Sequence, residues 1–199
     1  MACNHKFMTD LALDYVDWSP KTLFIGTFNP EWNLGNNYAE WFYGRTQRNS
    51  FWCILPNIFG EKSLLSGNRS AWISFCGKHQ IAITDILVSI NANEQNQKHR
   101  EVISKFKDDD LEQFEVSIND IPALLKKFPS IKQVCITRQT LDGFWGTQLQ
   151  ETITFLNKQH NIRLLPLRSP SRGARRGVVG DFCEFISKRW QEQGFLINP

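Results

Sequence analysis

Four short apolar runs stand out along the chain, separated by longer stretches in which apolar residues recur every three or four positions. The runs are residues 22–28 (TLFIGTF), 81–84 (IAIT), 132–137 (KQVCIT) and 162–166 (IRLLP). Each is rich in β-branched or large apolar residues, and its apolarity is continuous rather than alternating. Continuous apolarity is typical of a strand that is covered on both faces. We therefore predict four strands inside one sheet.

The intervening segments show the spacing of amphipathic helices. The pattern predicts helices over residues 50–59, 69–78, 119–128, 141–159 and 181–193. Segment 119–128 (NDIPALLKKF) shows the clearest boundaries, because an Asn-Asp start and an early proline precede an apolar stripe and a basic end. Strands that alternate with helices favour a parallel sheet. The predicted fold is α/β, a three-layer α/β/α sandwich with a central, mainly parallel four-stranded sheet.

Length and composition fit one compact domain over residues 1–199. The chain is 41% hydrophobic and 22% charged, and it contains no internal repeat or glycine/serine linker. A chain of this length can bury roughly 70% of its unfolded surface, so its core needs neither disulfides nor a metal. No apolar run reaches the ~20 residues of a membrane span, and none follows the first residues as in a signal peptide. We expect a cytosolic monomer without a membrane partner.

The cysteines and histidines give no sign of a cofactor. The five cysteines are odd in number and widely scattered, without a Cys-x-x-Cys pair, which fits neither a disulfide framework nor a zinc site. We therefore expect all five to be reduced, mostly buried residues: Cys3, Cys53, Cys76, Cys135 and Cys183. The histidines are equally dispersed, at His5, His79, His99 and His160. The sequence predicts no metal and no cofactor.

Charge is distributed unevenly, although the net charge is only +3. Residues 162–180 contain five arginines and no acid, whereas the acids are densest at residues 108–110, which we interpret as a solvated face. A local basic stripe on a nearly neutral protein is typical of a contact with an anionic backbone. A solvated arginine-rich loop is the alternative, and charge alone does not separate the two.

Polar and aromatic residues follow each predicted strand. Asn29 and the aromatic group at residues 41–43 follow the first strand, Asp85 the second, Arg138 the third, and a Ser-Pro-Ser loop with arginines the fourth. In parallel sheets, ligands bind beyond the carboxyl ends of the strands, so we expect these residues to converge. Aromatic faces suit stacking on a base and amides suit reading its edge, while hydroxyls and arginines suit phosphate oxygens.

Nucleotide-binding motifs are missing, but a different combination is present. Neither Gly-x-x-x-x-Gly-Lys-Ser/Thr nor Gly-x-Gly-x-x-Gly occurs, which argues against a P-loop or dinucleotide enzyme. Residues 24–30 (FIGTFNP), residues 48–52 (RNSFW) after an aromatic, and the loop at 169–171 (SPS) are present instead. Together they resemble the uracil-DNA glycosylase superfamily, most closely its mismatch-specific and hypoxanthine-DNA branches. The resemblance spans residues 22–180, and the Asn-x-Phe-Trp element is its most specific part.

The resemblance implies an enzyme that flips a base out of DNA and hydrolyses its N-glycosidic bond without a cofactor. Its carried-over catalytic positions are Asn29, which would orient the attacking water, Asn49, and Asp85 as a supporting group. The expected base-binding residues are Phe28, Phe42, Tyr43 and Arg138, with Phe42 as the stacking aromatic if the register slips from Tyr43. The expected DNA-binding residues are Arg168, Ser169, Ser171, Arg172, Arg175 and Arg176.

Several alternatives stay open. Asn29 also suits the turn before Pro30, Asn49 suits an ordinary helix N-cap, and Asp85 suits a simple ion pair. Residues 44–48 are longer and more basic than the family's usual link, and the positions of Arg138 and Arg168 also depart from its pattern. The target base is therefore uracil or hypoxanthine, or a bulky modified pyrimidine such as some phages carry. A DNA-binding module that has lost catalysis is the alternative from another class.

Overall fold

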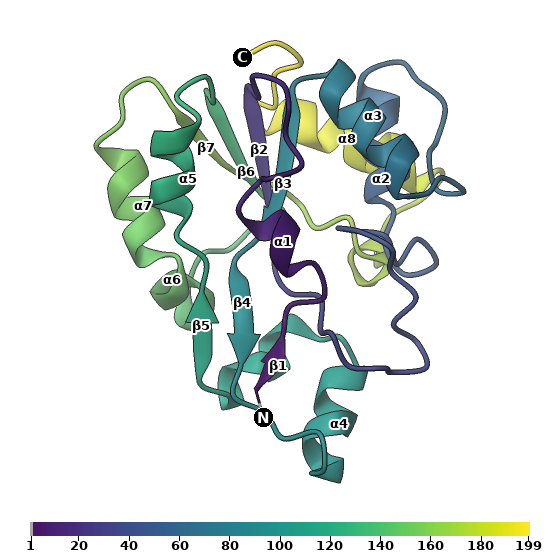
Figure 1. Ribbon diagram of the computed structural model, residues 1–199. Helices are drawn as coiled ribbons and strands as arrows, with labels where there is room; N and C mark the ends of the chain where they lie inside the picture. Colours follow the sequence, from purple (N-terminus) through teal and green to yellow (C-terminus); the bar gives the residue numbers. More distant parts are fainter. Residues whose placement is uncertain (1) are drawn as a thin grey trace.

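The computed structural model describes residues 2–199 and is built on a parallel four-stranded sheet (Figure 1). The strands are β2 (Thr22–Gly26), β3 (Ile81–Asp85), β6 (Gln133–Ile136) and β7 (Arg163–Pro166), in the spatial order β3-β2-β6-β7. All three neighbouring pairs are parallel. The four predicted strands and the α/β fold class are confirmed, with β2 ending at Gly26, two residues earlier than predicted.

Helices cover both faces of this sheet. Helices α5 (Ile121–Lys127), α6 (Gly143–Gln148) and α7 (Gln150–Asn157) lie on one side, and α2 (Phe51–Ile58), α3 (Arg69–Lys78) and α8 (Phe182–Glu192) lie on the other (Figure 1). Neighbouring residues of β2 pack into different hydrophobic cores on the two faces of the sheet. Leu23 and Ile25 pack with the first group of helices, and Phe24 packs with the second. This explains why the central residues of β2 are continuously apolar. The predicted helix over 141–159 is instead two helices that meet at Leu149.

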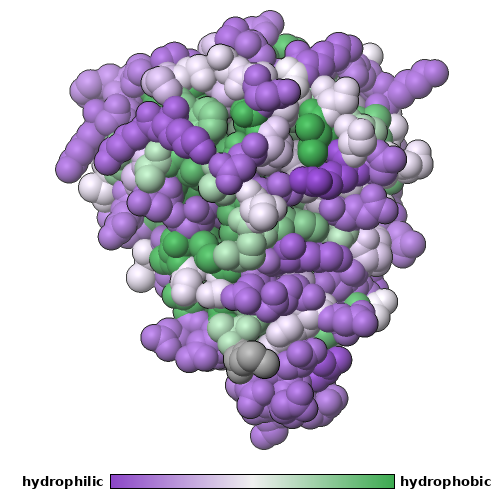
Figure 2. All heavy atoms as spheres, viewed as in Figure 1, coloured by the Kyte–Doolittle hydropathy of each residue, from purple (hydrophilic) through white to green (hydrophobic). Residues whose placement is uncertain are grey.

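A second, antiparallel sheet extends below the first and was not predicted. It contains β1 (Cys3–Asn4), β4 (Leu87–Ile90) and β5 (Val116–Ile118), in the order β1-β4-β5. Only Ile86 separates β3 from β4, so the chain runs directly from one sheet into the other. The connection from β4 to β5 holds α4 (Gln97–Ser104) and the 3₁₀ helix η1 (Asp108–Gln113), and the lobe around α4 is strongly hydrophilic (Figure 2).

Two shorter elements complete the chain, α1 (Met8–Leu11) and the 3₁₀ helix η2 (Arg172–Arg175). The helices within residues 2–199 are all too short or too polar to cross a membrane.

A disulfide joins Cys53 of α2 to Cys183 of α8, and it corrects the expectation that all five cysteines are reduced. The two residues are 130 positions apart in sequence, but α2 and α8 pack side by side and bring their Cα atoms to 5.9 Å. Sequence spacing could not reveal this pair, because the helix packing creates it. Cys3, Cys76 and Cys135 are free and buried, as predicted.

Candidate active site

A pocket of about 730 Å³ opens at the carboxyl ends of the parallel strands. The chain passes from β2 to β3 on one side and later returns to β6 on the other, so the strand order reverses beside β2. Ligands of open α/β sheets bind at such a reversal. Nine of the predicted site residues line the pocket: Phe28, Asn29, Tyr43, Asn49, Asp85, Arg138, Ser169, Ser171 and Arg172.

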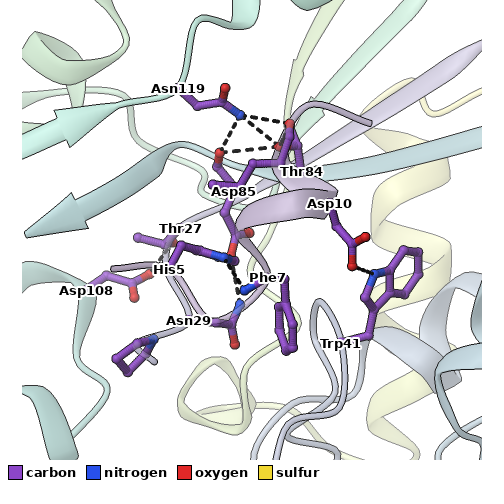
Figure 3. Close-up of polar contacts among 12 residues, drawn as sticks. His5, Phe7, Asp10, Thr27, Asn29, Trp41, Thr84, Asp85, Asp108 and Asn119 are labelled. Atoms are coloured by element: carbon purple, nitrogen blue, oxygen red, sulfur yellow. Dashed lines mark hydrogen bonds and ion pairs between the residues drawn. The ribbon is translucent and has the colours of Figure 1, made fainter. Parts of the chain in front are cut away.

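The Asp85 carboxylate forms the centre of a buried hydrogen-bond network at the pocket floor (Figure 3). Its Oδ2 accepts hydrogen bonds from Asn29 Nδ2 at 2.7 Å and from His5 Nε2 at 2.8 Å. The backbone N–H of Phe7 donates to His5 Nδ1 at 3.0 Å, so the ring proton belongs on Nε2. Asn29 must point its NH₂ group at the carboxylate, which leaves Asn29 Oδ1 free for another partner.

The other carboxylate oxygen, Asp85 Oδ1, lies against Gly26 at the end of β2. A Cβ atom at Gly26 would collide with Asp85 Oδ1, so only glycine leaves room for the carboxylate here. Within residues 2–199, no group donates a hydrogen bond to Oδ1, which keeps contact with the pocket. Asn119 Nδ2 fixes the backbone nearby by donating to Thr84 Oγ1 at 2.9 Å and to the Asp85 carbonyl at 3.2 Å (Figure 3).

Tyr43 forms a flat aromatic wall of the pocket. Its ring stacks on Phe51 with centroids 3.9 Å apart and an interplanar angle of 6°, and its hydroxyl bonds Thr137 Oγ1 at 3.0 Å. Burial, and secondarily the charge of Asp85, raises the pKa of Tyr43 well above its ordinary value, so the phenol keeps its proton. The backbone φ of Tyr43 is +56°, a conformation that is rare for a bulky residue and recurs at functional sites.

Phe42 does not line the pocket, which corrects its predicted base-stacking role. Its side chain has no exposed surface and packs against Phe7 and His5, with ring centroids 5.6 and 5.7 Å away. The positive φ of Tyr43 turns the chain between the two aromatics, so one faces the core and the next faces the pocket.

Asn49 and the Ser-Pro-Ser loop form one side of the pocket together. The Ser50 N–H donates to the Pro170 carbonyl at 2.9 Å, and the Arg172 N–H donates to the Arg48 carbonyl at 2.9 Å. These backbone bonds hold the loop against the start of α2. Asn49 Oδ1 accepts the Phe51 N–H at 2.8 Å, the local bond of a helix-start asparagine, and its Nδ2 remains as a donor on the pocket side.

The arginines of the basic loop lie in different settings. Arg172 lines the pocket, and Arg175 and Arg176 are exposed beyond it. Arg168 is half-buried: its guanidinium donates to the Ala174 carbonyl at 2.9 Å and lies 5.1 Å from the Phe185 ring. Arg168 thus braces the loop from inside, and its DNA contact stays a prediction.

A further wall comes from residues 105–110. The acids at 108–110, which we interpreted as a solvated face, do stay exposed, with 42% of the Asp108 side chain and 80% of the Asp109 side chain accessible, but they also line the pocket. Thr27 Oγ1 donates to Asp108 Oδ2 at 2.7 Å, and Arg138 pairs with Asp109 at 2.8 Å. The Arg45 guanidinium lies 3.6 Å from the Phe106 ring centroid. The Asp108 side chain keeps 42% of its exposure, but loss of water around its carboxylate raises its pKa in spite of the Thr27 hydrogen bond. Burial lowers the pKa of Arg45.

Sequence reasoning missed His5 and this second wall, and it missed the contact of Arg45 with Phe106. The run at residues 105–110 (KFKDDD) was visible as a charge cluster, but nothing in the sequence placed it opposite β2. In total, six basic and four acidic side chains line the pocket, a mixture suited to a polar ligand with both donors and acceptors. Across residues 2–199, no group of three or more His, Cys, Asp or Glu side chains is placed to hold a metal ion.

Comparison with known proteins gives one structural likeness. No protein-family model matches the chain, and no curated protein is similar to it in sequence. A solution NMR structure described as a "putative Uracil DNA glycosylase from Methanosarcina acetivorans" matches with a TM-score of 0.55. The two chains share the same fold. The match covers 90% of this chain and 94% of the other at 14% sequence identity, so it supports the architecture and not a particular substrate.

Proposed function

We propose that this protein is a DNA glycosylase that extrudes an altered base and hydrolyses its N-glycosidic bond. The observation that carries the proposal is the buried pair of Asp85 and Asn29 at the floor of the pocket. Each has one oxygen free for a water molecule, and the surrounding wall offers an aromatic face and a basic loop. The fold that this chain shares with the Methanosarcina acetivorans structure is compatible with the same reaction class.

The reaction needs a water molecule at C1′ of the deoxyribose and support for a departing base. Asn29 Oδ1 and Asp85 Oδ1 hold the water. As the C1′–N bond breaks, its electron pair leaves with the base and positive charge builds on the sugar, where the Asp85 carboxylate and the DNA phosphates stabilise it. The water oxygen then bonds to C1′, and its proton passes through Asp85 to the departing base. Products are the free base and an abasic site.

The leaving base develops negative charge, which donors on the pocket wall stabilise. Asn49 Nδ2 is the candidate donor, because Asn49 Oδ1 is already bonded to the Phe51 N–H. One preorganised donor of this kind is typically worth ~3 kcal/mol, or about a hundredfold in rate. Phe28 and Tyr43 supply the apolar and aromatic contact for the base.

Base extrusion costs a few kcal/mol, and the loop after β7 has the features that offset it. Arg172, Arg175 and Arg176 would bind phosphates. Val179 is 95% exposed in the same segment, between the positive-φ residues Gly177 and Gly180. An exposed apolar side chain beside arginines suits insertion into the gap that the extruded base leaves.

Uracil or hypoxanthine is the first candidate for the base, as the sequence resemblance implies. A bulky modified pyrimidine is the second, and the pocket volume of about 730 Å³ favours it, because pockets of ~300–1,000 Å³ hold ligands much larger than one base. The wall at residues 105–110 would then face a polar adduct. Excision of such a base would make the protein a defence enzyme against phages with modified DNA.

The test is base release from duplexes that each carry one altered base: uracil, hypoxanthine, hydroxymethylcytosine or glucosylated hydroxymethylcytosine. We expect an alkali-labile site and the free base, detected by mass spectrometry, with one of these duplexes. Asn29→Ala should slow release about a hundredfold without weakening DNA binding. Binding of all duplexes without release from any would favour the non-catalytic module.

A further inference from the structure

We infer that His5 is a positioning residue that holds the Asp85–Asn29 pair in its reactive arrangement. This inference rests on the proposed function and assigns a role to a residue outside the glycosylase resemblance. The His5 side chain has no exposed surface, and both ring nitrogens are engaged, Nδ1 by the Phe7 N–H and Nε2 by Asp85. His5 therefore does not touch the substrate and can act only through Asp85.

The backbone around His5 holds both members of the pair. The His5 N–H donates to the Val88 carbonyl at 2.8 Å, in the strand that continues from Asp85. The next residue, Lys6, donates its N–H to the Asn29 carbonyl at 2.7 Å. One short N-terminal segment thus connects the chain that carries Asn29 with the chain that carries Asp85.

Packing fixes the orientation of the imidazole. The rings of Phe7, Phe28 and Phe42 each have their centroids 5.7 Å from that of His5. A buried ring in such an aromatic enclosure cannot turn without displacing its neighbours. The Nε2–H therefore stays directed at Asp85 Oδ2 (Figure 3).

The two oxygens of the Asp85 carboxylate have different hydrogen-bond partners. Asp85 Oδ2 receives donors from both His5 and Asn29, which fixes the carboxylate and leaves Oδ1 to face the pocket. Because Asn29 Nδ2 must meet Oδ2, Asn29 Oδ1 is left free for the water molecule. Without the His5 donor, the carboxylate can rotate and the Asn29 amide loses its fixed orientation.

Three variants separate this role from simple packing. His5→Gln places an amide donor where Nε2 lies, His5→Asn keeps only an acceptor for the Phe7 N–H, and His5→Phe keeps the ring without either bond. We expect His5→Asn and His5→Phe to slow single-turnover base release about 10- to 100-fold, the range found for residues that orient a primary ligand at metal sites. DNA affinity should be unchanged, and His5→Gln should restore most of the rate.

His79 supplies the matched control. It is also a largely buried histidine, with Nε2 2.6 Å from Glu61 and its ring 4.0 Å from that of Phe59, but it lies outside the pocket. His79→Asn should therefore leave base release unchanged. A wild-type rate in His5→Asn would overturn the positioning role, as would equal losses in His5→Gln and His5→Asn at equal melting temperatures.

A measurement without substrate keeps this inference separate from the proposed function. In ¹⁵N NMR spectra, the Asn29 side-chain NH₂ should be protected from exchange in the wild type and in His5→Gln, and unprotected in His5→Asn. Unchanged protection in His5→Asn would overturn the inference even if the wild type releases base. If the wild type releases no base from any duplex, the proposed function fails, and the NMR result alone decides whether His5 orders the pair.

Discussion

Replacing Gly26 by alanine should displace the Asp85 carboxylate while leaving its charge and its chemical identity unchanged. Gly26 ends β2 directly opposite Asp85 in the parallel register. Its backbone is ordinary strand, so alanine introduces no backbone strain. The added methyl would instead collide with Asp85 Oδ1 and lie 3.1 Å from the Tyr43 hydroxyl oxygen. Because Asp85 is the end of a buried strand and not a flexible surface chain, relief requires movement within the site.

The expected magnitudes follow from this contact. Overpacking of a tight interior site costs about 1–3 kcal/mol, and each kcal/mol lowers the melting temperature of a chain of this size by roughly 2–4 °C. A carboxylate displaced by ~1 Å loses its alignment with the water and sugar, which costs about a hundredfold in rate. Gly26→Ala should therefore fold, melt a few degrees lower, and release base about a hundred times more slowly.

The assay is single-turnover base release with saturating enzyme, alongside a thermal melt of the same preparation. Gly35→Ala is the control, because a Cβ atom at Gly35 would meet nothing within 4 Å. It should match the wild type in both measurements. If Gly26→Ala releases base at the wild-type rate, the position of Asp85 Oδ1 does not matter for the reaction, and our reasoning about this carboxylate is refuted.

Two further predictions concern DNA binding and alkaline stability. Arg172→Gln and Arg175→Gln should each reduce the slope of log affinity against log salt by about one, whereas Lys132→Gln, at the opposite end of the sheet, should not change it; unchanged slopes would exclude the loop as the DNA surface. Burial raises the pKa of the Cys3 thiol to about 12 and that of Tyr43 well above 10, so the unfolded chain loses these protons first. The contribution of these two groups to the free energy of unfolding should be fully present below pH 9 and should be lost as the pH rises from 9 to 12. A melting temperature that does not change over this range would contradict the raised pKa values.

The sequence predicted the parallel sheet because its strands contain continuous apolar runs, and in β2, β3 and β6 these runs are buried on two faces. The antiparallel sheet left no such signal: β1 has two residues, and β5 has three, of which two are exposed. Residues 141–159 were predicted as one helix because their apolar spacing continues across Leu149. In the structure, α6 ends and α7 begins at Leu149.

The site was predictable where it depends on strand ends and unpredictable where it depends on tertiary pairing. The rule for carboxyl ends of parallel strands placed Asn29, Asp85 and Arg138 in the pocket correctly. His5 has no local pattern, because its role arises from contact with a carboxylate 80 residues away. The hydrogen bond of Asp108 to Thr27 could not be predicted either, because it joins residues 81 positions apart in the sequence.

The central claim is that Asp85 takes part in hydrolysis of a base from DNA. Its most direct test is single-turnover base release by the wild type and Asp85→Asn, each with measured DNA affinity. The amide retains the shape of the side chain and an oxygen for the donors from His5 and Asn29, but it removes the charge. We predict release by the wild type, a loss of about a hundredfold or more in Asp85→Asn, and equal affinities. Equal release rates for the two proteins would contradict the account, as would tight DNA binding by both with no base released by either.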